Sequence, residues 1–287
     1  MPPSIELQQG HFRLSLRPDL GGCVSGFWLG DVPVLRSTPA AGLDSVRKSA
    51  SYPLAPFSNR IGQGRFEWLG TDYALAQNFL PEPHAIHGVA WQRPWQVKQL
   101  GNDSATLAYS HQPDDSWPFA FACEQSFRLG ATGLTMDLNI TNRHSTAAPV
   151  GGGWHPYFVK RANSHLAFNA TGRWEMGMDK LPTERRASQG LNTNCAALDV
   201  DHCFDGWQGA ADLRDELLNI RITSSLTNLV VFTQPGRDFV AVEPVSHVNN
   251  AINMLPKLVE APGSDLVSLQ PGQTWSAQMA IDVTRVQ

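Results

Sequence analysis

The stretch that decides the fold class is residues 121–140, FACEQSFRLGATGLTMDLNI. Apolar side chains recur at every second position from Phe121 to Leu129, with Gln125 as the one exception, and again from Leu134 to Ile140. A period of two is that of a β-strand with one buried face. The two runs are separated by GATG, a short glycine-bounded break that is typical of a hairpin turn. The stretch therefore predicts two antiparallel strands whose apolar side chains share one face.

The same pattern extends over most of the chain. Hairpins are predicted at residues 24–35, 66–75 and 95–109, and single strands at 218–223, 228–233, 239–243 and 274–283. Helical periodicity is scarce: only residues 210–218 suggest one or two helical turns, and residues 162–197 suggest strands joined by long loops. Regularly spaced hairpins with few helices predict an all-β fold of large antiparallel sheets packed face to face. We expect one domain, residues 1–287.

Composition excludes several classes of protein. The 287 residues include 22 Lys and Arg against 26 Asp and Glu, so no basic excess favours a nucleic-acid partner. No apolar run approaches the roughly 20 residues that span a bilayer, and no basic and apolar leader is visible. We therefore expect a cytoplasmic protein with no membrane partner. The four cysteines contain no C-x-x-C pair and predict reduced, buried thiols.

Three loop-like segments place polar side chains among prolines, glycines and aromatic residues. In residues 53–62, PLAPFSNRIG, Arg60 offers a planar fork to substrate oxygens or to a carboxylate, and Asn59 stands beside it. In residues 84–91, HAIHGVAW, two histidines alone are a weak metal site, and His87 is either a ligand-binding group or a plain loop histidine. In residues 151–158, GGGWHPYF, His155 between Trp and Pro favours a functional role.

Two carboxylates complete the set of candidates. Glu243 ends the apolar run FVAVE and precedes Pro244, which we expect to end ladder pairing. Burial would raise the pKa of such a carboxyl and make it a usable base. Asp201 lies beside His202 and Cys203, but neighbours in a strand point to opposite faces, so these three side chains do not converge on a metal. From the residues alone, a His and Glu pair without a nucleophile suits proton transfer, and the nine tryptophans suit stacking on sugar rings.

Taken together, these segments resemble the aldose 1-epimerase (galactose mutarotase) family. The matching stretches, spread over most of the chain, are PFSNRI at 56–61 with GRF at 64–66, Asn78 with IHG at 86–88, HPYF at 155–158, DHCF at 201–204, and VEP at 242–244 with NAIN at 250–253. The resemblance implies a β-supersandwich with a sugar-binding cleft. It also implies interconversion of the α and β anomers of a free aldose, such as galactose or glucose, without cofactor or metal.

The resemblance also implies roles for individual residues. Glu243 stands where the family has its general base, and His155 stands where it has its general acid. His87, Asp201 and Arg60, with Asn59 beside them, stand where the family holds and polarises the sugar. The implied partner is a small monosaccharide, and the sequence predicts no oligomeric state. We expect Trp91 and Trp154, next to the two motif histidines, to line the cleft and Trp275 to pack in the core.

The identity of the sugar stays open. The chain is shorter than well-known galactose mutarotases, and Glu243 is followed by Pro244 where those enzymes often have Thr-Gln. The net charge of −4 mildly favours a neutral sugar. The closest alternative, a hexose-6-phosphate mutarotase, needs basic side chains that converge, for which Arg36, Arg47 and Lys48 are available. Three other functions remain as alternatives. The protein could be a non-catalytic sugar-binding module, or a glycoside hydrolase that uses Asp201 and Glu243. A metal enzyme is the third, although no ligand set has a recognised spacing.

Overall fold

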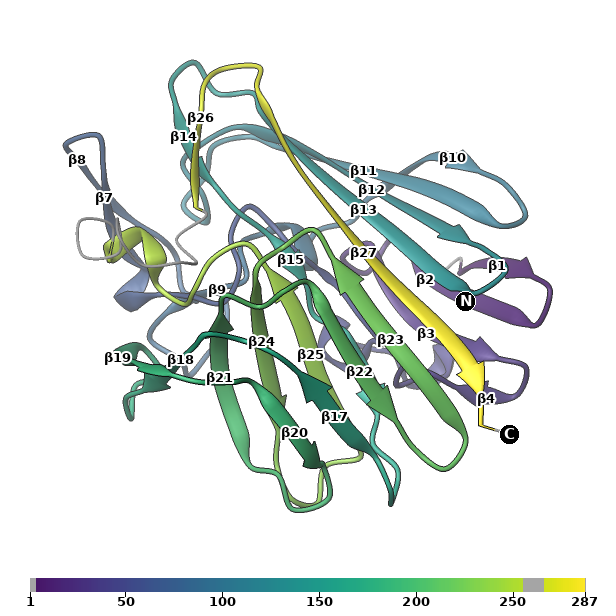
Figure 1. Cartoon of the computed structure of the whole chain (residues 1–287). Helices are drawn as coiled ribbons and strands as arrows, with labels where there is room; N and C mark the ends of the chain where they lie inside the picture. Colours follow the sequence, from purple (N-terminus) through teal and green to yellow (C-terminus); the bar gives the residue numbers. More distant parts are fainter. Residues whose placement is uncertain (1–3, 255–265, 287) are drawn as a thin grey trace.

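The computed structural model, which describes residues 4–254 and 266–286, is built almost entirely from antiparallel strands (Figure 1). This confirms the all-β prediction. The larger sheet has nine strands in the order β10 (Gln96–Leu100), β11 (Ser104–His111), β12 (Phe121–Leu129), β13 (Gly133–Asn142), β27 (Thr274–Arg285), β23 (Leu218–Ser224), β22 (Ala210–Arg214), β17 (His165–Phe168) and β20 (Leu191–Asn194).

A second sheet of eight strands carries the candidate site. Its order is β19 (Pro182–Ala187), β18 (Gly172–Met176), β21 (Val200–Asp205), β24 (Asn228–Thr233), β25 (Phe239–Val245), β15 (Gly153–Trp154) and β5 (Pro53–Leu54), and β16 (Tyr157–Val159) pairs with β25 beside this path. Strands from distant parts of the sequence therefore become neighbours in this sheet.

Smaller elements complete the fold. A four-stranded sheet contains β1 (Ile5–Gln9), β2 (Phe12–Arg17), β3 (Cys23–Leu29) and β4 (Val32–Pro33), and three strand pairs are β6 (Arg60–Ile61) with β9 (Ala85–Ile86), β7 (Arg65–Trp68) with β8 (Thr71–Ala74), and β14 (Ala148–Val150) with β26 (Val267–Leu269). The helices of the described residues are short 3-10 turns: η1 (Ala40–Gly42), η2 (Val46–Lys48), η3 (Gly62–Gly64), η4 (Ala90–Gln92) and η5 (Ala251–Asn253). None of the helices in the described residues is long and apolar enough to cross a membrane.

The hairpin predicted from residues 121–140 is the pair β12 and β13. Phe121 pairs with Asn142 and Leu129 with Leu134, so the alternating side chains of both strands bury the same face. Gln125 is the polar exception on that face. It is buried because its amide donates to the Gly22 carbonyl and accepts from the Trp154 indole. All four cysteines are free and buried, as predicted.

Three sequence-based expectations about local structure are wrong. Residues 210–218 form no helix, because Ala211 and Leu213 alternate with exposed neighbours and pair in β22. Residues 162–197 contain strands β17 to β20 joined by short rather than long loops. Pro244 does not end its strand: β25 continues to Val245.

Proline is tolerated inside β25 because of the direction that its nitrogen faces. The backbone nitrogens of Val242 and Ser246 donate to Pro156 and Gly152 respectively. The nitrogen of Pro244 faces the same side, where the neighbouring chain passes from β15 to β16. No ladder hydrogen bond is needed there, so the missing N–H of proline has no cost.

The glycine run before His155 allows the backbones of three strands to approach closely. Gly153 pairs with Leu54 on one side and with Val245 on the other. A Cβ atom at Gly153 would lie 2.2 Å from the Pro244 carbonyl oxygen and 3.0 Å from the Val245 Cα. Both are backbone atoms of a central strand, which cannot move aside as a flexible side chain would.

We therefore expect Gly153→Ala to lower the free energy of unfolding by about 1–3 kcal/mol, the usual cost of overpacking. Urea denaturation followed by tryptophan fluorescence measures this. Gly130→Ala is the matched control, because the nearest heavy atom to its added Cβ would be 4.0 Å away. Equal urea denaturation midpoints for the two variants would show that the strands can move apart without loss of stability.

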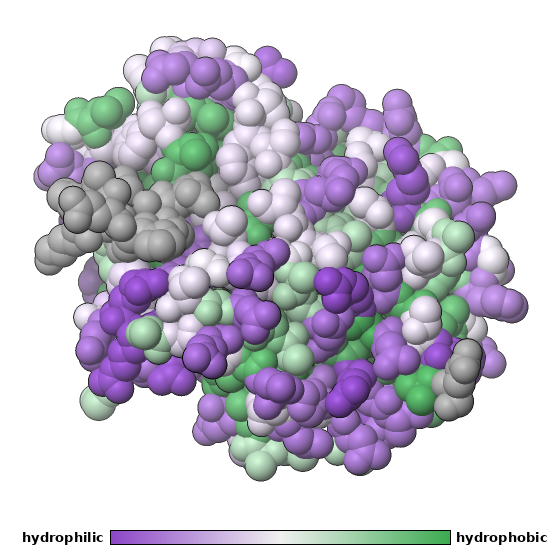
Figure 2. Space-filling model, in the orientation of Figure 1, coloured by the Kyte–Doolittle hydropathy of each residue, from purple (hydrophilic) through white to green (hydrophobic). Residues whose placement is uncertain are grey.

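Hydrophilic residues dominate the face of the molecule shown in Figure 2, and the hydrophobic areas on it are small and separate. Single exposed apolar side chains of this kind are ordinary on a soluble surface. The buried apolar side chains instead pack together in a core cluster that includes Trp154, Leu138 and Ile281. Trp275 packs against this core, as predicted.

Candidate functional site

A cavity of about 350 Å³ opens on the face of the eight-stranded sheet. Its volume is at the lower end of the range common for small-molecule sites. All six residues that the sequence singled out line this one cavity, although they come from segments far apart in the chain: Asn59, Arg60, His87, His155, Asp201 and Glu243.

Strand register explains why part of this set converges. Val230 in β24 pairs with Glu243 in β25, and Phe232, two residues further along β24, pairs with Asp201 in β21. Side chains two apart on a strand share a face, and so do directly paired residues. Asp201, Phe232, Val230 and Glu243 therefore point to the same side of the sheet, which is the side of the cavity.

Glu243 and His155 are in direct contact. The His155 Nε2 lies 3.2 Å from the Glu243 Oε1, and the Tyr157 hydroxyl lies 3.3 Å from the same nitrogen. The second carboxylate oxygen, Oε2, and the His155 Nδ1 are buried and have no hydrogen-bond partner among the described residues. The contacts within the described residues thus leave one polar atom of each group without a hydrogen-bond partner.

Burial controls the protonation of this pair. Loss of solvent raises the pKa of Glu243 well above its ordinary value of 4.5, and the nearby Asp201 raises it further. The same loss of solvent lowers the pKa of His155 well below 6.5, with the neighbouring His87 and Arg36 adding to the effect. Burial thus opposes both the state with two protons, which has a net positive charge, and the state with none, which has a net negative charge. In the free protein both shifts favour a state in which Glu243 carries the proton and His155 is neutral.

His87 is a neutral hydrogen-bond donor to the cavity. Its ring is buried, which lowers its pKa to about 3. Its Nδ1 accepts a hydrogen bond from the Asn59 backbone N–H at 3.1 Å. A neutral imidazole carries one proton, so the accepting Nδ1 leaves that proton on Nε2. The backbone of His87 has a positive φ of 61° and donates to the Asn59 carbonyl, which ties the two candidate residues together.

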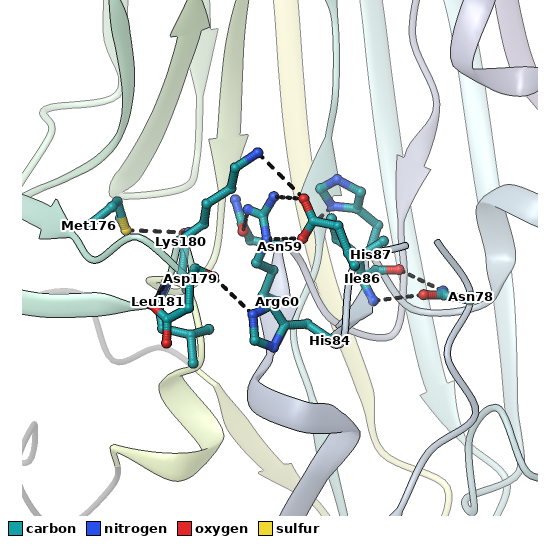
Figure 3. Close-up of polar contacts among 12 residues, drawn as sticks. Asn59, Arg60, Asn78, His84, Ile86, His87, Met176, Asp179, Lys180 and Leu181 are labelled. Carbon is teal, nitrogen blue, oxygen red and sulfur yellow. Dashed lines mark hydrogen bonds and ion pairs between the residues drawn. The ribbon is translucent and has the colours of Figure 1, made fainter. Parts of the chain in front are cut away.

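Arg60 is held mainly by a carboxylate that the sequence did not indicate. Its Nε and Nη2 donate to the two oxygens of Glu82 at 2.8 and 3.0 Å, and its Nη1 donates to the Asn59 side-chain oxygen at 3.0 Å. Lys180 also points to Glu82 (Figure 3). This pairing lowers the Glu82 pKa to about 2. Each terminal nitrogen of Arg60 retains a second N–H, and the Asn59 amide keeps its NH₂ group, so both side chains can still donate to a ligand.

Asn78, a residue of the matching motif to which the sequence analysis gave no role, holds the histidine loop. Its amide donates to the carbonyls of Ile86 and Gly88, and its oxygen accepts from the Ile86 N–H at 2.9 Å (Figure 3). These bonds fix the backbone on both sides of His87. Gly88 is required next to it, because a Cβ there would lie 2.1 Å from the Ala55 carbonyl oxygen.

The aromatic lining differs from the sequence-based expectation. Trp91 and Trp154, which we expected to line the cleft, are 1% and 0% exposed, pack in the core and do not line the cavity. Their indole N–H groups donate to the Gly88 carbonyl and the Gln125 side chain. The rings that line the cavity are two tyrosines and three phenylalanines: Tyr52, Tyr157, Phe79, Phe232 and Phe239. The period-two pattern of residues 239–243 places Phe239 on the same face as Glu243 and could have indicated one of them.

Two further histidines lie outside the cavity. Each ring nitrogen of His84 faces backbone: Nδ1 accepts from the Gln63 N–H and Nε2 lies 2.9 Å from the Asp179 carbonyl (Figure 3). His202 faces Glu175, on the opposite side of the strand from Asp201, as strand geometry predicts. Within residues 4–254 and 266–286, no three His, Cys, Asp or Glu side chains form a group that could hold a metal ion.

The sequence matches the family model for aldose 1-epimerase over residues 3–282. It is 30% identical over 294 residues to YphB, an uncharacterised protein of Escherichia coli K12, and the match covers 96% of this chain and 97% of YphB. A second uncharacterised protein of the same organism, YihR, is 30% identical over 77% of this chain and 74% of its own length.

Solved structures share the fold over nearly the whole chain. A candidate aldose 1-epimerase from Escherichia coli K12 superposes with a TM-score of 0.89 at 28% identity, covering 99% of both chains. A galactose mutarotase-like protein from Clostridium acetobutylicum superposes with a TM-score of 0.85 at 19% identity, covering 99% of this chain and 95% of its own. The latter likeness is one of fold alone.

Proposed function

Since this chain belongs to the aldose 1-epimerase family, we propose that it is an isomerase that interconverts the α and β anomers of a free aldose, such as galactose or glucose. The observation that carries this proposal is the buried contact between His155 and Glu243, whose remaining polar atoms lack partners among the described residues. A monosaccharide is the substrate, and acid–base chemistry is the means.

The reaction requires one proton to leave the sugar and one to arrive. Passage of the shared proton from Glu243 to His155 across their 3.2 Å contact gives a carboxylate and an imidazolium. Glu243 then takes the proton of the O1 hydroxyl while His155 delivers a proton to the ring oxygen O5, so the C1–O5 bond breaks and C1 becomes an aldehyde. Rotation about the C1–C2 bond presents the other face of the aldehyde, and ring closure reverses both transfers. The single proton that the pair shares is restored in each cycle.

The other residues hold the sugar while the ring opens. The His87 Nε2–H, the remaining N–H groups of Arg60 and the Asn59 amide donate to sugar oxygens, and the Asp201 carboxylate accepts from sugar hydroxyls. Because His87 is neutral, it donates without adding a positive charge beside His155. The apolar faces of the sugar pack on the aromatic rings of the cavity.

Polarimetry or NMR on freshly dissolved pure anomers tests the proposal. We expect this protein to speed the approach to anomeric equilibrium for at least one aldose in a panel of galactose, glucose, arabinose, xylose and sugars with a charged group at C6. Binding measured by calorimetry without any change in rate would instead indicate a sugar-binding module. Release of reducing sugar from an aryl glycoside would indicate a glycoside hydrolase.

The pH dependence should be bell-shaped and broad. If both groups titrated at their ordinary values of 4.5 and 6.5, activity would be confined to the short interval between them. Burial lowers the pKa of His155 and raises that of Glu243, so protonation of His155 gives the acid limb and ionisation of Glu243 gives the alkaline limb, with the one-proton state between them. We expect a plateau of kcat/KM through pH 7. A narrow maximum near pH 5.5 would contradict it.

A further inference from the structure

One end of the cavity is lined by three arginines whose charges are not neutralised. Arg36, Arg47 and Arg237 all line the cavity. Among the described residues, none of the three has a carboxylate within ion-pair distance. Asp238 attracts Arg36 electrostatically but makes no ion pair with it. The other two cations of the cavity, Arg60 and Lys180, differ because both are paired with Glu82.

Arg36 is held rigidly in place. Its guanidinium carbon lies 3.9 Å from the centroid of the Tyr157 ring and 5.1 Å from that of Phe239. Its Nη2 donates to the carbonyls of Arg47 and Ser49 at 2.7 and 2.6 Å. Among the described residues, Nη1 donates to no backbone carbonyl and to no carboxylate, which leaves N–H donors for an anionic group. A half-buried guanidinium fixed by stacking and backbone bonds is a preorganised anion donor.

The other two arginines stand on neighbouring rings. The Arg47 guanidinium carbon lies 4.0 Å from the centroid of Phe79, and that of Arg237 lies 6.0 Å from the centroid of Phe239, the ring that Arg36 also approaches. Lys48, which the sequence grouped with Arg36 and Arg47, does not join them: it pairs with Asp44 at 2.9 Å and does not line the cavity. Convergence of Arg237 with the first two is produced only by the fold.

The position of this end relative to the acid–base pair is set by Tyr157. Its ring stacks on the His155 ring, with centroids 4.3 Å apart, and it also lies under the Arg36 guanidinium. If His155 serves O5 of the sugar, the arginines lie on the O5 side of the ring. The carbon that follows O5 away from C1 is C5, so a group on C6 extends in this direction.

We propose that the natural substrate is an aldose with an anionic group on C6, a phosphate, sulfonate or carboxylate, and that Arg36, Arg47 and Arg237 bind this group. The inference rests on the proposed mutarotase function and narrows its substrate class. The net charge of −4 favours a neutral sugar, whereas this inference favours an anionic one. The local cluster of cations takes precedence, because it determines the electrostatic field inside the cavity.

The test compares kcat/KM for glucose with that for glucose 6-phosphate, 6-deoxy-6-sulfoglucose and glucuronate, which share the ring but differ in the group at C6. We expect at least one anionic sugar to exceed glucose by about 10- to 100-fold, the contribution of one charge-assisted contact or more. The three sugars identify which anion fits. Raising the ionic strength should reduce the difference, since salt screens partly exposed charges.

Arg47→Gln and Arg237→Gln are the informative variants, because both side chains are exposed and their loss leaves the fold intact. Each should lower kcat/KM for the preferred anionic sugar by roughly 10-fold or more and change that for glucose little. Lys48→Gln, next in the chain to Arg47 but outside the cavity, is the matched control and should change neither value.

The possible outcomes separate this inference from the mutarotase function. Turnover of neutral aldoses that equals or exceeds that of all three anionic sugars would overturn the inference and leave the function standing. If no aldose is turned over, the proposed mutarotase function is refuted. Calorimetry then tests only whether the three arginines bind an anionic sugar. Binding of an anionic sugar that Arg47→Gln weakens would support the site, and no binding by any of the three would overturn it.

Discussion

Replacing Glu243 with glutamine is expected to lower kcat for mutarotation by about 10²- to 10⁴-fold, the usual contribution of one positioned acid–base group. Glutamine has nearly the same shape as glutamate and can still hydrogen-bond to His155, but it cannot take the proton of the O1 hydroxyl. Initial rates by polarimetry, corrected for the uncatalysed reaction, measure the loss. Sugar affinity by calorimetry should change far less than kcat.

The stability of this variant distinguishes a chemical role from a structural one. A carboxyl whose pKa is raised on folding stabilises the protein only below its unfolded pKa, near 4.5, and this contribution is lost as the pH rises through the folded value. At neutral pH the buried carboxyl therefore costs stability, and Glu243→Gln should be at least as stable as the native protein. Glu67→Gln, at an exposed carboxylate, is the control. Native activity in Glu243→Gln would refute the assigned base.

Replacing His155 with asparagine should cause a loss of similar size. The Nε2 of His155 lies against the Glu243 carboxylate, and an amide in its place can neither deliver a proton to O5 nor recover it. We expect kcat to fall by about 10²- to 10⁴-fold and the pH profile to lose its bell shape, because one of the two titrating groups is gone. Polarimetry across the pH range measures both effects.

Two further variants make this result specific. His155→Gln places an amide nitrogen closer to the position of Nε2, and it should be as inactive as His155→Asn if proton transfer, not hydrogen bonding, is what His155 supplies. His165→Asn is the matched control, since His165 lies on β17 in the other large sheet and does not line the cavity. The assignment of the acid would be wrong if His155→Gln retained native rates.

The fold was largely predictable because strands leave a local signature. The alternation in residues 121–140 reports one buried face, and β12 and β13 form there within a residue or two of the predicted ends. The failures occurred where the local pattern was ambiguous. In residues 210–218, a run with five apolar positions fitted a helical turn as well as a strand, and pairing with β17 and β23 selected the strand.

The candidate site was predictable only as a set of residues. The short motifs singled out Glu243, His155 and their four companions, and the structure brings all six to one cavity. Their roles in catalysis and binding stay predictions until the variants are measured. The Glu82 carboxylate and Arg237 were missed, because no feature of their own sequence neighbourhoods distinguishes them from ordinary surface residues. Tyr157 lies within the matching stretch HPYF but was given no role.

By itself the sequence predicted most of the strands, the candidate acid–base residues and the family that they resemble, since each is indicated by side chains close together in the chain. Only the tertiary structure decided that Pro244 remains within a central strand, that tyrosines rather than Trp91 and Trp154 line the cavity, and that three arginines converge on it. It also placed His155 against Glu243 in a buried position, which shifts the pKa values of both. These properties depend on burial and proximity, which arise when strands distant in sequence pair and exclude water between them.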